Sequence, residues 1–426
     1  MTTLIKNALI IPMTKRNFFF TGDILIKDGK IARAEKNIEE KADEVIDASS
    51  MIALPSFVNA HTHLSMVLMR NYKDTCENLQ AWLSEIFPIE DKLNDEDIYQ
   101  SSRLGCAELI DSGCTVFADM YFNAWETVKA VKEAGIRGII GQTFMNDGND
   151  AEWRIKNLSP RILEAIGDDD MFRLDAAVHA VYTATPDCYR VAAEWVKERG
   201  VYLNTHLSET KKENDDCMKT YGMSPAALIE STGAFSVPAY AAHSVYLSDE
   251  DMDILSRNHV SAVYNPSSNM KLASGVAKIR EMKAKGINIA LGTDGASSNN
   301  NLSMIKEMNI GALLQTVSTM TPSAATPYDI LEMATINGAK AIGLDKRIGT
   351  IESGKDADIT LINTDDVNMA PLNDPLSALV FSADRKNVDT VFCRGRKVKE
   401  HGLLTTIDKN EAISKTKERW EDILKR

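Results

Sequence analysis

Eight short apolar runs without polar alternation recur through the middle of the chain, and they limit its possible folds more than any other feature. Runs of this kind are typical of strands buried on both faces, as in a parallel sheet. Helix-length segments, such as residues 95–111 and 186–199, lie between several of them. Eight such strand–helix units predict an α/β fold, a (β/α)8 TIM-like barrel over residues 56–345. The runs cover residues 52–60, 114–120, 136–144, 174–181, 201–206, 239–245, 260–264 and 287–291.

The two ends of the chain have the pattern of hairpins. Residues 23–27 and 30–34 are two alternating runs separated by Asp28-Gly29, a pair that favours a type I′ turn. Near the other end, residues 358–362 predict a strand and residues 389–400 a second hairpin around Arg394-Gly395-Arg396. We expect residues 1–55 and 346–426 to form one small β-sandwich domain beside the barrel. A surface helix is predicted over residues 409–426.

The charge balance bears on the class of partner. The chain has 48 basic and 61 acidic side chains, a formal net charge of −13. Contacts to phosphates need an excess of Lys and Arg, so this balance disfavours binding to nucleic acid or to an anionic membrane surface. We therefore expect a small-molecule substrate. We also expect the chain to form a homo-oligomer.

Cysteine usage and hydropathy bear on the compartment. The six cysteines form no CxxC pair, which indicates free thiols in a reducing compartment. No stretch approaches 18 uncharged apolar residues, so no transmembrane helix is predicted. The first residues are interpreted as a strand rather than a signal peptide. Together these features predict a cytoplasmic protein.

The histidines are concentrated at the ends of the apolar runs. The carboxyl ends of the strands of a (β/α)8 barrel meet at one face, which carries the active site. A single histidine there is more often a structural residue, but five of the seven in the chain share this position. The five are His61, His63, His179, His206 and His243.

One subset of these residues predicts a metal site. His61 and His63 are two residues apart in a strand, so both imidazoles point to the same side. His206 and Asp294, which follow later strands, complete three nitrogens and one carboxylate oxygen. This set suits Zn²⁺, and Fe²⁺ or Mn²⁺ could also occupy it. The fourth run offers no lysine to bridge two ions, so we expect one metal per chain.

Glu209 and His243 are the predicted proton-handling groups. Glu209 follows His206 by three residues, close enough to reach a metal water without being a ligand, and we expect it to be the general acid/base. The alternative is a charge at a helix N-terminus. His243 could orient or protonate the metal water, or serve as a fifth ligand.

Five motifs make the chain resemble the amidohydrolase superfamily over nearly its whole length. They are LPSFVNAHTHLSMVLMR, THLSET, AAHSVYL, YNPSSNMKLASG and LGTDGASSNN. The motifs are similar to those of the mononuclear branch that holds adenosine-type deaminases and s-triazine hydrolases. Within it, the chain most resembles 5-methylthioadenosine/S-adenosylhomocysteine deaminases.

The resemblance implies further site residues. The segment LQAWLSEIFPIEDKL is similar to the family segment that ends in the ribose-binding glutamate, which assigns that role to Glu90. The substrate histidine of the family corresponds to His179, and an arginine of the loop after the third strand corresponds to Arg154. Glu209 and Asp294 also contact the substrate in this scheme. The chain departs from the family in having Ala180-Val181 after His179, where Ser-Pro is usual. The NPSSN segment is interpreted as a loop cap rather than as catalytic.

The implied activity is hydrolytic deamination of an adenosine-type nucleoside at C6. Asp294 would accept a proton from the attacking water, His243 would orient that water, and Glu209 would protonate the ring nitrogen. Candidate substrates are 5-methylthioadenosine, S-adenosylhomocysteine, adenosine and 5′-deoxyadenosine. Three alternatives stay open: a guanine or pterin deaminase, in which Glu90 would be structural; an s-triazine hydrolase; and, least favoured, a non-catalytic barrel relative.

Overall fold

Eight parallel strands form a nearly closed barrel in the computed structural model, which describes residues 2–146, 148 and 150–426. Consecutive strands are neighbours throughout, and the backbone N–H of Asp294, just after the last strand, donates to the carbonyl of His61 in the first (3.0 Å). The predicted (β/α)8 fold is therefore confirmed. The strands are β6 (Phe57–Thr62), β7 (Cys114–Tyr121), β8 (Arg137–Phe144), β9 (Phe172–Val178), β10 (Leu203–Leu207), β11 (Ala239–His243), β12 (Ser261–Tyr264) and β13 (Ile289–Leu291).

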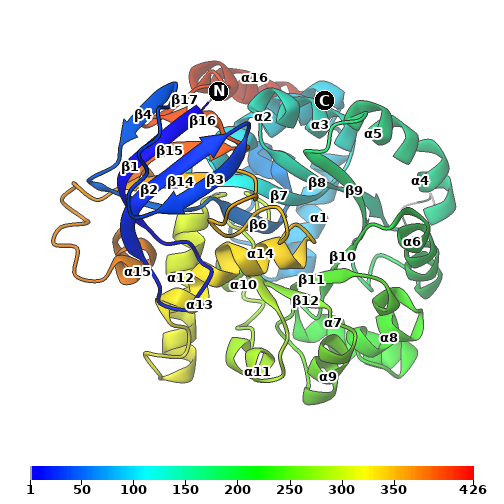
Figure 1. Cartoon of the computed structure of the whole chain (residues 1–426). Coiled ribbons are helices and arrows are strands. Elements are labelled where there is room, and N and C mark those ends of the chain that lie inside the picture. The colour runs from blue at the N-terminus through cyan, green and yellow to red at the C-terminus, as the bar shows by residue number, and fades with distance from the viewer. Residues whose placement is uncertain (1, 147, 149) are drawn as a thin grey trace.

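Helices surround this barrel (Figure 1). Local signals account for the bounds of two of them, α2 and α6. A capping box between Asn94 and Asp97 starts α2, and the Thr185 side chain caps α6, which ends at Gly200 in the left-handed conformation. The helices are α1 (Leu79–Glu90), α2 (Asp95–Asp111), α3 (Ala124–Ala134), α4 (Ala151–Asn157), α5 (Ser159–Ile166), α6 (Pro186–Arg199), α7 (Lys211–Tyr221), α8 (Pro225–Ser231), α9 (Asp249–Arg257), α10 (Pro266–Lys271), α11 (Ile279–Ala284), α12 (Met304–Thr319), α13 (Pro327–Ala334) and α14 (Ile336–Ala341).

A second, mainly antiparallel sheet is built from both ends of the chain. Its central pair joins β5 to β14, so residues from the two ends lie side by side. The last helix, α16 (Lys409–Ile423), packs on α2. The strands are β1 (Thr2–Ile10), β2 (Phe20–Lys27), β3 (Lys30–Glu35), β4 (Glu44–Asp47), β5 (Met51–Pro55), β14 (Ile359–Asn363), β15 (Val388–Cys393), β16 (Arg396–Glu400) and β17 (Leu403–Leu404).

The first apolar run differs from its predicted form, because it contains two strands of different sheets. Residues 51–55 pair with β14, whereas residues from 57 onward pair with β7. The change of partner occurs at Ser56, whose N–H donates to Asp358 (3.0 Å), while the N–H of Phe57 donates to Gly113 (2.9 Å). Both strands are apolar because both are covered, so composition alone does not reveal the boundary between them.

The two predicted hairpin turns pack against each other. Asp28 and Gly29 have φ of 51° and 78°, as a type I′ turn requires, and Arg394 and Gly395 have φ of 49° and 74°. A Cβ at Gly29 would lie 2.8 Å from the carbonyl oxygen of Arg394. Glycine is therefore needed at position 29 for both its backbone conformation and this close approach.

A buried ion cluster connects the barrel to the second sheet. Arg137 of β8 is 1% exposed, and its guanidinium lies 2.8 Å from a carboxylate oxygen of Asp356 and 3.0 Å from one of Asp358, just before β14. Thr115 also donates to Asp358 (3.0 Å). These contacts fix the second sheet on the side of β7 and β8 where those strands begin.

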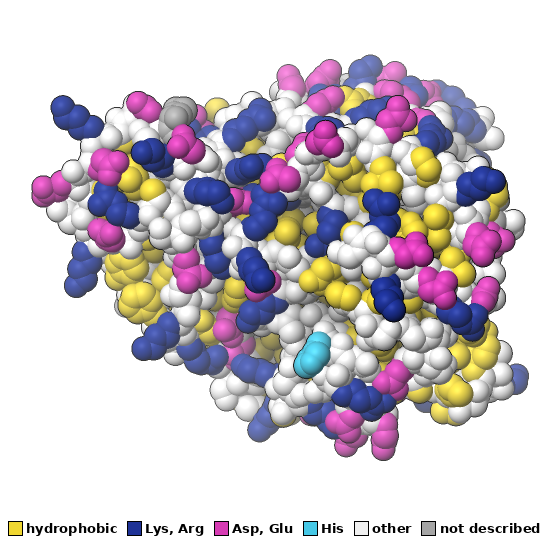
Figure 2. All heavy atoms as spheres, turned by 45° about the vertical axis from the view of Figure 1, so that its right-hand side comes forward, with side chains coloured by type: hydrophobic (Ala, Val, Ile, Leu, Met, Phe, Trp, Pro, Cys, Tyr) yellow, Lys and Arg dark blue, Asp and Glu magenta, His cyan; other side chains and the backbone are white. Residues whose placement is uncertain are grey.

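The apolarity of the helices and the distribution of charge on one face of the molecule can be described. Among the described residues, no helix has the length and apolarity needed to cross a bilayer. Figure 2 shows acidic and basic side chains interspersed on the face that it draws. The negative net charge is not gathered into one patch on that face.

Candidate active site

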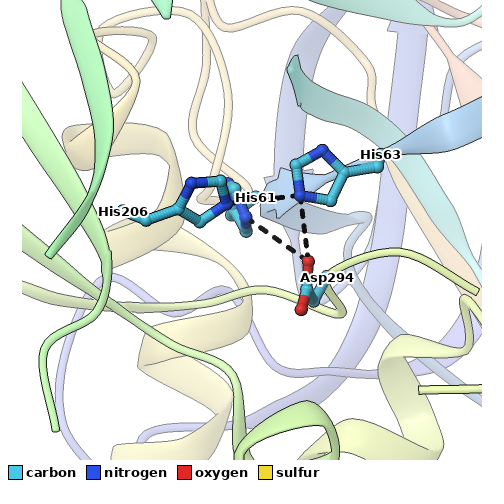
Figure 3. A group of neighbouring side chains, drawn as sticks. All are labelled: His61, His63, His206 and Asp294. Atoms are coloured by element: carbon cyan, nitrogen blue, oxygen red, sulfur yellow. Dashed lines mark hydrogen bonds and ion pairs between the residues drawn. The ribbon is translucent and has the colours of Figure 1, made fainter. Parts of the chain in front are cut away.

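Four side chains converge at the carboxyl ends of the barrel strands. Figure 3 shows the imidazoles of His61 and His63, from the end of β6, and of His206, from β10, pointing toward the carboxylate of Asp294. One candidate ligand atom from each residue lies within 4.8 Å of all the others. Asp294 Oδ1 is 3.5 Å from His61 Nε2 and 3.2 Å from His63 Nε2. The structure thus brings together all four residues predicted to bind metal.

In two of the imidazoles, a backbone carbonyl oxygen next to Nδ1 determines which ring nitrogen carries the hydrogen. His63 Nδ1 lies 2.6 Å from the carbonyl oxygen of Met120, and His206 Nδ1 lies 2.7 Å from that of His179. Carbonyl oxygens only accept, so both Nδ1 atoms are donors, and in the neutral imidazoles both Nε2 atoms present lone pairs. These two Nε2 atoms are only 3.3 Å apart, so two neutral rings would repel each other unless a proton or a metal ion lies between them.

His61 gives a second reason to expect a cation. Its side chain is fully buried, and neither ring nitrogen has a hydrogen-bond partner among the described residues. Buried polar atoms rarely lack partners, and a metal ion satisfies such an atom. Three nitrogens and one carboxylate oxygen form a donor set that fits Zn²⁺ and related divalent ions.

The electrostatics of this group also favour positive charge. Burial lowers the pKa of His61 to about 4 and that of His206 well below its usual value, so both are neutral ligands. Burial opposes ionisation of Asp294 as well, but its close contacts with the imidazoles of His61 and His63 bring its pKa well below the usual range. For His63, burial lowers the pKa, but Asp294 outweighs it and raises the value to about 9. A proton at His63 therefore occupies the place that a metal ion would take.

Glu209 lies at the edge of the metal group, in the turn that follows β10. Its carboxylate is buried; Oε1 accepts from Ser274 Oγ (3.0 Å), and Oε2 is 3.7 Å from His243 Nε2. Burial raises the pKa of Glu209, and nearby His243 opposes that shift. The backbone N–H groups of Ser208 and Glu209 both donate to the carboxylate of Glu213 (3.0 and 2.8 Å). Glu213 of α7 thereby holds the backbone that carries Glu209.

His243 is held from two directions at the end of β11. Its backbone N–H donates to Asn265 Oδ1 (3.2 Å), and its Nδ1 lies 2.8 Å from Asn269 Oδ1. The residue has φ of 71°, an uncommon conformation for a residue other than glycine. Its ring is stacked on that of His206, with centroids 5.3 Å apart, so His243 lies beside the metal group.

A cavity opens above these residues, at the carboxyl ends of the barrel strands. Glu90, the last residue of α1, and His179, just after β9, both line it with Glu209, His243 and Asp294. Much of the remaining wall is apolar. That wall includes Leu79, Trp82, Leu83, Ile86 and Phe87 of α1 with Met145 and Leu272.

The pKa values of the two predicted substrate-binding residues, Glu90 and His179, are shifted from their ordinary values. Burial raises the pKa of Glu90 to about 7, although Tyr121 beside it acts in the opposite direction. Burial, with the charge of His63 adding to it, lowers the pKa of His179 to about 3. His179 Nδ1 lies 2.7 Å from Thr183 Oγ1, which itself donates to the Ala180 carbonyl (3.2 Å). The Thr183 oxygen is thus the acceptor, and His179 Nε2 is left as an acceptor for another group.

Two other sequence features lie outside the cavity wall. Ala180 and Val181, where the chain departs from the family pattern, are buried in the core, while Tyr182 lines the cavity. Arg154 of α4 lines a second, smaller cavity, which shares Tyr121, Phe122 and Thr143 with the first one. A substrate contact for Arg154 therefore stays a prediction.

Sequence reasoning missed the uncharged residues that support the site. Ser268 and Ser298 donate to Asp294 Oδ2 (2.5 and 2.8 Å), and Asn269 and Ser274 contact His243 and Glu209. Five serines and asparagines in one eleven-residue segment, YNPSSNMKLASG after its tyrosine, were the signal available. Serine and asparagine side chains also commonly cap helices and turns, so the motif alone did not show which groups they contact.

Comparison with known proteins agrees with this geometry. Residues 52–398 match the profile of the amidohydrolase family. A 5-methylthioadenosine/S-adenosylhomocysteine deaminase of Acetivibrio thermocellus is 41% identical over 436 residues, covering 100% of both chains. A 5′-deoxyadenosine deaminase of Methanobrevibacter smithii is 40% identical, covering 99% of this chain and 98% of its own. Among solved structures, a zinc-bound adenosine deaminase from Xanthomonas campestris has a TM-score of 0.95 at 25% identity, covering 100% of this chain and 99% of that one.

Proposed function

The chain belongs to the amidohydrolase family, and we propose that it catalyses metal-dependent hydrolytic deamination of adenosine-type nucleosides, releasing ammonia and an inosine-type product. One observation carries the proposal: a single cavity is lined by His63, His206 and Asp294 of the candidate metal group, by the buried Glu209 beside it and by the partly buried Glu90. The first two suit hydrolysis at a ring carbon, and the third suits a pair of sugar hydroxyls. The relatives that are about 40% identical are named for this class of reaction.

We propose Zn²⁺ as the ion, held by His61, His63, His206 and Asp294. The orphaned imidazole of His61 and the close pair of Nε2 atoms support this assignment. When bound, such an ion lowers the pKa of a water from about 15.7 to about 7, which makes a nucleophile available at neutral pH. Fe²⁺ and Mn²⁺ fit the same donor set less specifically.

The proton-handling groups act around the attacked carbon, C6 of the purine. Glu209 is the proton donor to the adjacent ring nitrogen, because it lies beside the metal group and burial raises its pKa. Asp294 is ionised and accepts a proton from the attacking water. His243 is 3.7 Å from Glu209 and orients that water. The amino group then leaves as ammonia once it has received a proton.

Glu90 and His179 orient the nucleoside in this proposal. A carboxylate at the end of α1 can accept from both ribose hydroxyls, and the free Nε2 of His179 can accept from the nucleoside. The apolar wall formed by α1, Met145 and Leu272 suits an apolar 5′ group. We therefore favour 5-methylthioadenosine and 5′-deoxyadenosine as substrates, ahead of adenosine and S-adenosylhomocysteine.

Two rival activities use the same metal chemistry, so a panel of substrates tests the proposal. Ammonia release would be measured from 5-methylthioadenosine, adenosine, free adenine, guanine and an amino-s-triazine. We expect the nucleosides to have the highest kcat/KM, because only they occupy the Glu90 end of the cavity. Faster turnover of guanine or of the triazine would replace this proposal with that rival.

We further propose that the protein acts in the cytoplasm and assembles as a homo-oligomer. All six cysteines are free thiols, as expected for a reducing compartment. Mass measurement in solution by light scattering tests the oligomer, and a monomer at micromolar concentration would contradict it.

A further inference from the structure

The segment from Asn265 to Gly275, called the β12 loop below, contains α10 and follows strand β12. Its sequence, NPSSNMKLASG, contains no histidine, cysteine, aspartate or glutamate. It lies at the carboxyl end of a barrel strand, where functional residues gather. The proposed reaction has so far assigned it no part.

We propose that the β12 loop is a positioning element, which orients Asp294, His243 and Glu209 through three separate side-chain hydrogen bonds. Each of the three groups has a different part in the proposed reaction, and each forms its hydrogen bond with a different residue of the loop. The kinetic part of this inference rests on the proposed function; the metal-binding part does not.

The first contact fixes the carboxylate of Asp294. Ser268 Oγ donates to Oδ2 (2.5 Å), and Ser298 supports the same oxygen (2.8 Å). The other oxygen, Oδ1, is left facing His61 and His63 at 3.5 and 3.2 Å. The two oxygens therefore have distinct surroundings, and the one that faces the metal group is free of hydroxyl donors among the described residues.

The second contact fixes the imidazole of His243. Asn269 Oδ1 accepts from Nδ1 (2.8 Å), so Nε2 faces Glu209. Asn265 Oδ1 accepts from the backbone N–H of the same histidine (3.2 Å) and supports its left-handed conformation. Both amides are fully buried, so the ring cannot exchange these partners for water.

The third contact fixes Glu209. Ser274 Oγ donates to Oε1 (3.0 Å), which leaves Oε2 on the side of His243. The loop holds this serine through its own backbone, because the N–H of Ser274 donates to the carbonyl of Asn269 (2.8 Å). The residues that contact His243 and Glu209 are therefore mechanically connected within one short segment.

Buried serines and asparagines could instead serve only to satisfy polar groups in the core. That role predicts equal effects of each substitution on folding and metal content. A positioning role predicts effects that separate by partner, because Ser268 supports a metal ligand whereas Asn269 and Ser274 support groups that move protons. Outer hydrogen bonds to ligands typically change metal affinity by about 10–100-fold.

The test compares four alanine variants of the full-length protein: Ser268→Ala, Asn269→Ala, Ser274→Ala and, as the matched control, Met270→Ala. Met270 lies in the same helix, is 53% exposed and does not line the cavity. Zinc affinity is measured by competition with a chromophoric chelator, without substrate. Steady-state kinetics with 5-methylthioadenosine are then measured on fully zinc-loaded protein.

We expect Ser268→Ala to weaken zinc affinity about tenfold or more. Asn269→Ala and Ser274→Ala should keep wild-type zinc affinity and lower kcat about tenfold with KM unchanged, the pattern of an interaction made only in the transition state. Asn269→Asp, which keeps an oxygen acceptor, should recover part of the lost kcat. Met270→Ala should match the wild type in both measurements.

Two results would overturn the inference. In the first, Ser268→Ala, Asn269→Ala and Ser274→Ala lose zinc, kcat and thermal stability in parallel, as packing defects would. In the second, all three match Met270→Ala. If the wild type deaminates no nucleoside, the proposed function fails, but the zinc affinity of Ser268→Ala still decides the metal-binding part.

Discussion

Two glutamates that line the same cavity have different proposed roles, and each role can be tested at the scale of single residues. Glu209 lies beside the metal group and contacts His243 and Ser274, whereas Glu90 is the last residue of α1. Burial raises the pKa of both carboxyls. A raised pKa suits a proton donor at Glu209. At Glu90 the raised pKa reflects desolvation of the carboxyl group in the cavity wall.

Glu209→Gln should keep its metal and lose nearly all turnover. The amide preserves the volume and the bond from Ser274 but cannot deliver a proton. General acid/base catalysis contributes about 10²–10⁴-fold, so we expect kcat to fall by about 10²-fold or more. Metal analysis and steady-state ammonia release on the same preparation test this. A variant that retains more than half of the wild-type kcat would remove Glu209 from the mechanism.

Glu90→Ala should impair nucleosides selectively. Hydrogen bonds to a charged group contribute about 1.5–3 kcal/mol, which corresponds to a fall in kcat/KM of about 10- to 150-fold. Free adenine has no ribose, so its slow turnover should barely change. The matched control is Glu85→Ala, which removes an exposed carboxylate of the same helix that pairs with Lys73. Equal losses on nucleoside and free base would make Glu90 a structural residue.

At the scale of elements, the bounds of a helix or strand could be predicted from the sequence wherever a local feature, such as a capping residue, sets them. The bounds of α2 and α6 agree with their predicted ranges because Asn94 and Thr185 cap them and Gly200 ends the second. The run that holds β5 and β6 was predicted as one strand, although the expected domain boundary at residues 55/56 falls inside it. The change of sheet occurs at Ser56, where the backbone bonds to partners about 60 and 300 residues away in sequence. The apolar composition of the run does not show which partners each part of it has.

The residues of the site likewise include some that the sequence predicts and some that it does not. Histidines and acids at strand ends were predictable, since few structural roles require them there and the barrel brings the strand ends together. The contacts of Ser268, Asn269 and Ser274 were not, because their meaning depends on which groups lie opposite in the folded chain. The roles assigned to the individual site residues remain predictions until the variants are measured.

The contact between the barrel and the second sheet can be tested through Arg137. Replacing this guanidinium by leucine leaves the carboxylates of Asp356 and Asp358 buried with one fewer cationic partner. Breaking a buried ion pair costs about 3–5 kcal/mol of unfolding free energy. Arg190→Leu removes an exposed arginine that pairs with Asp187 on α6 and should cost about 0–1 kcal/mol. Urea unfolding of both variants measures the difference, and equal costs would contradict a structural role for the cluster.

At the scale of the whole molecule, metal content should be close to one equivalent per chain. Among the described residues, one group of histidine, cysteine or acidic side chains has the geometry to hold an ion. Dialysis against a chelator should abolish activity, and one equivalent of Zn²⁺ should restore it. Metal analysis of protein produced with added zinc tests the number, and two tightly held equivalents would contradict a mononuclear site.

The central claim is that water replaces an amino group on the purine of a nucleoside at this metal site. The most direct measurement is incubation of the zinc-loaded protein with 5-methylthioadenosine in ¹⁸O-labelled water, followed by mass spectrometry of the product. We predict 5-methylthioinosine carrying one heavy oxygen, formed in equal amount to ammonia and absent from chelator-treated protein. Unchanged 5-methylthioadenosine, or release of free adenine in place of the labelled inosine product, would contradict the claim.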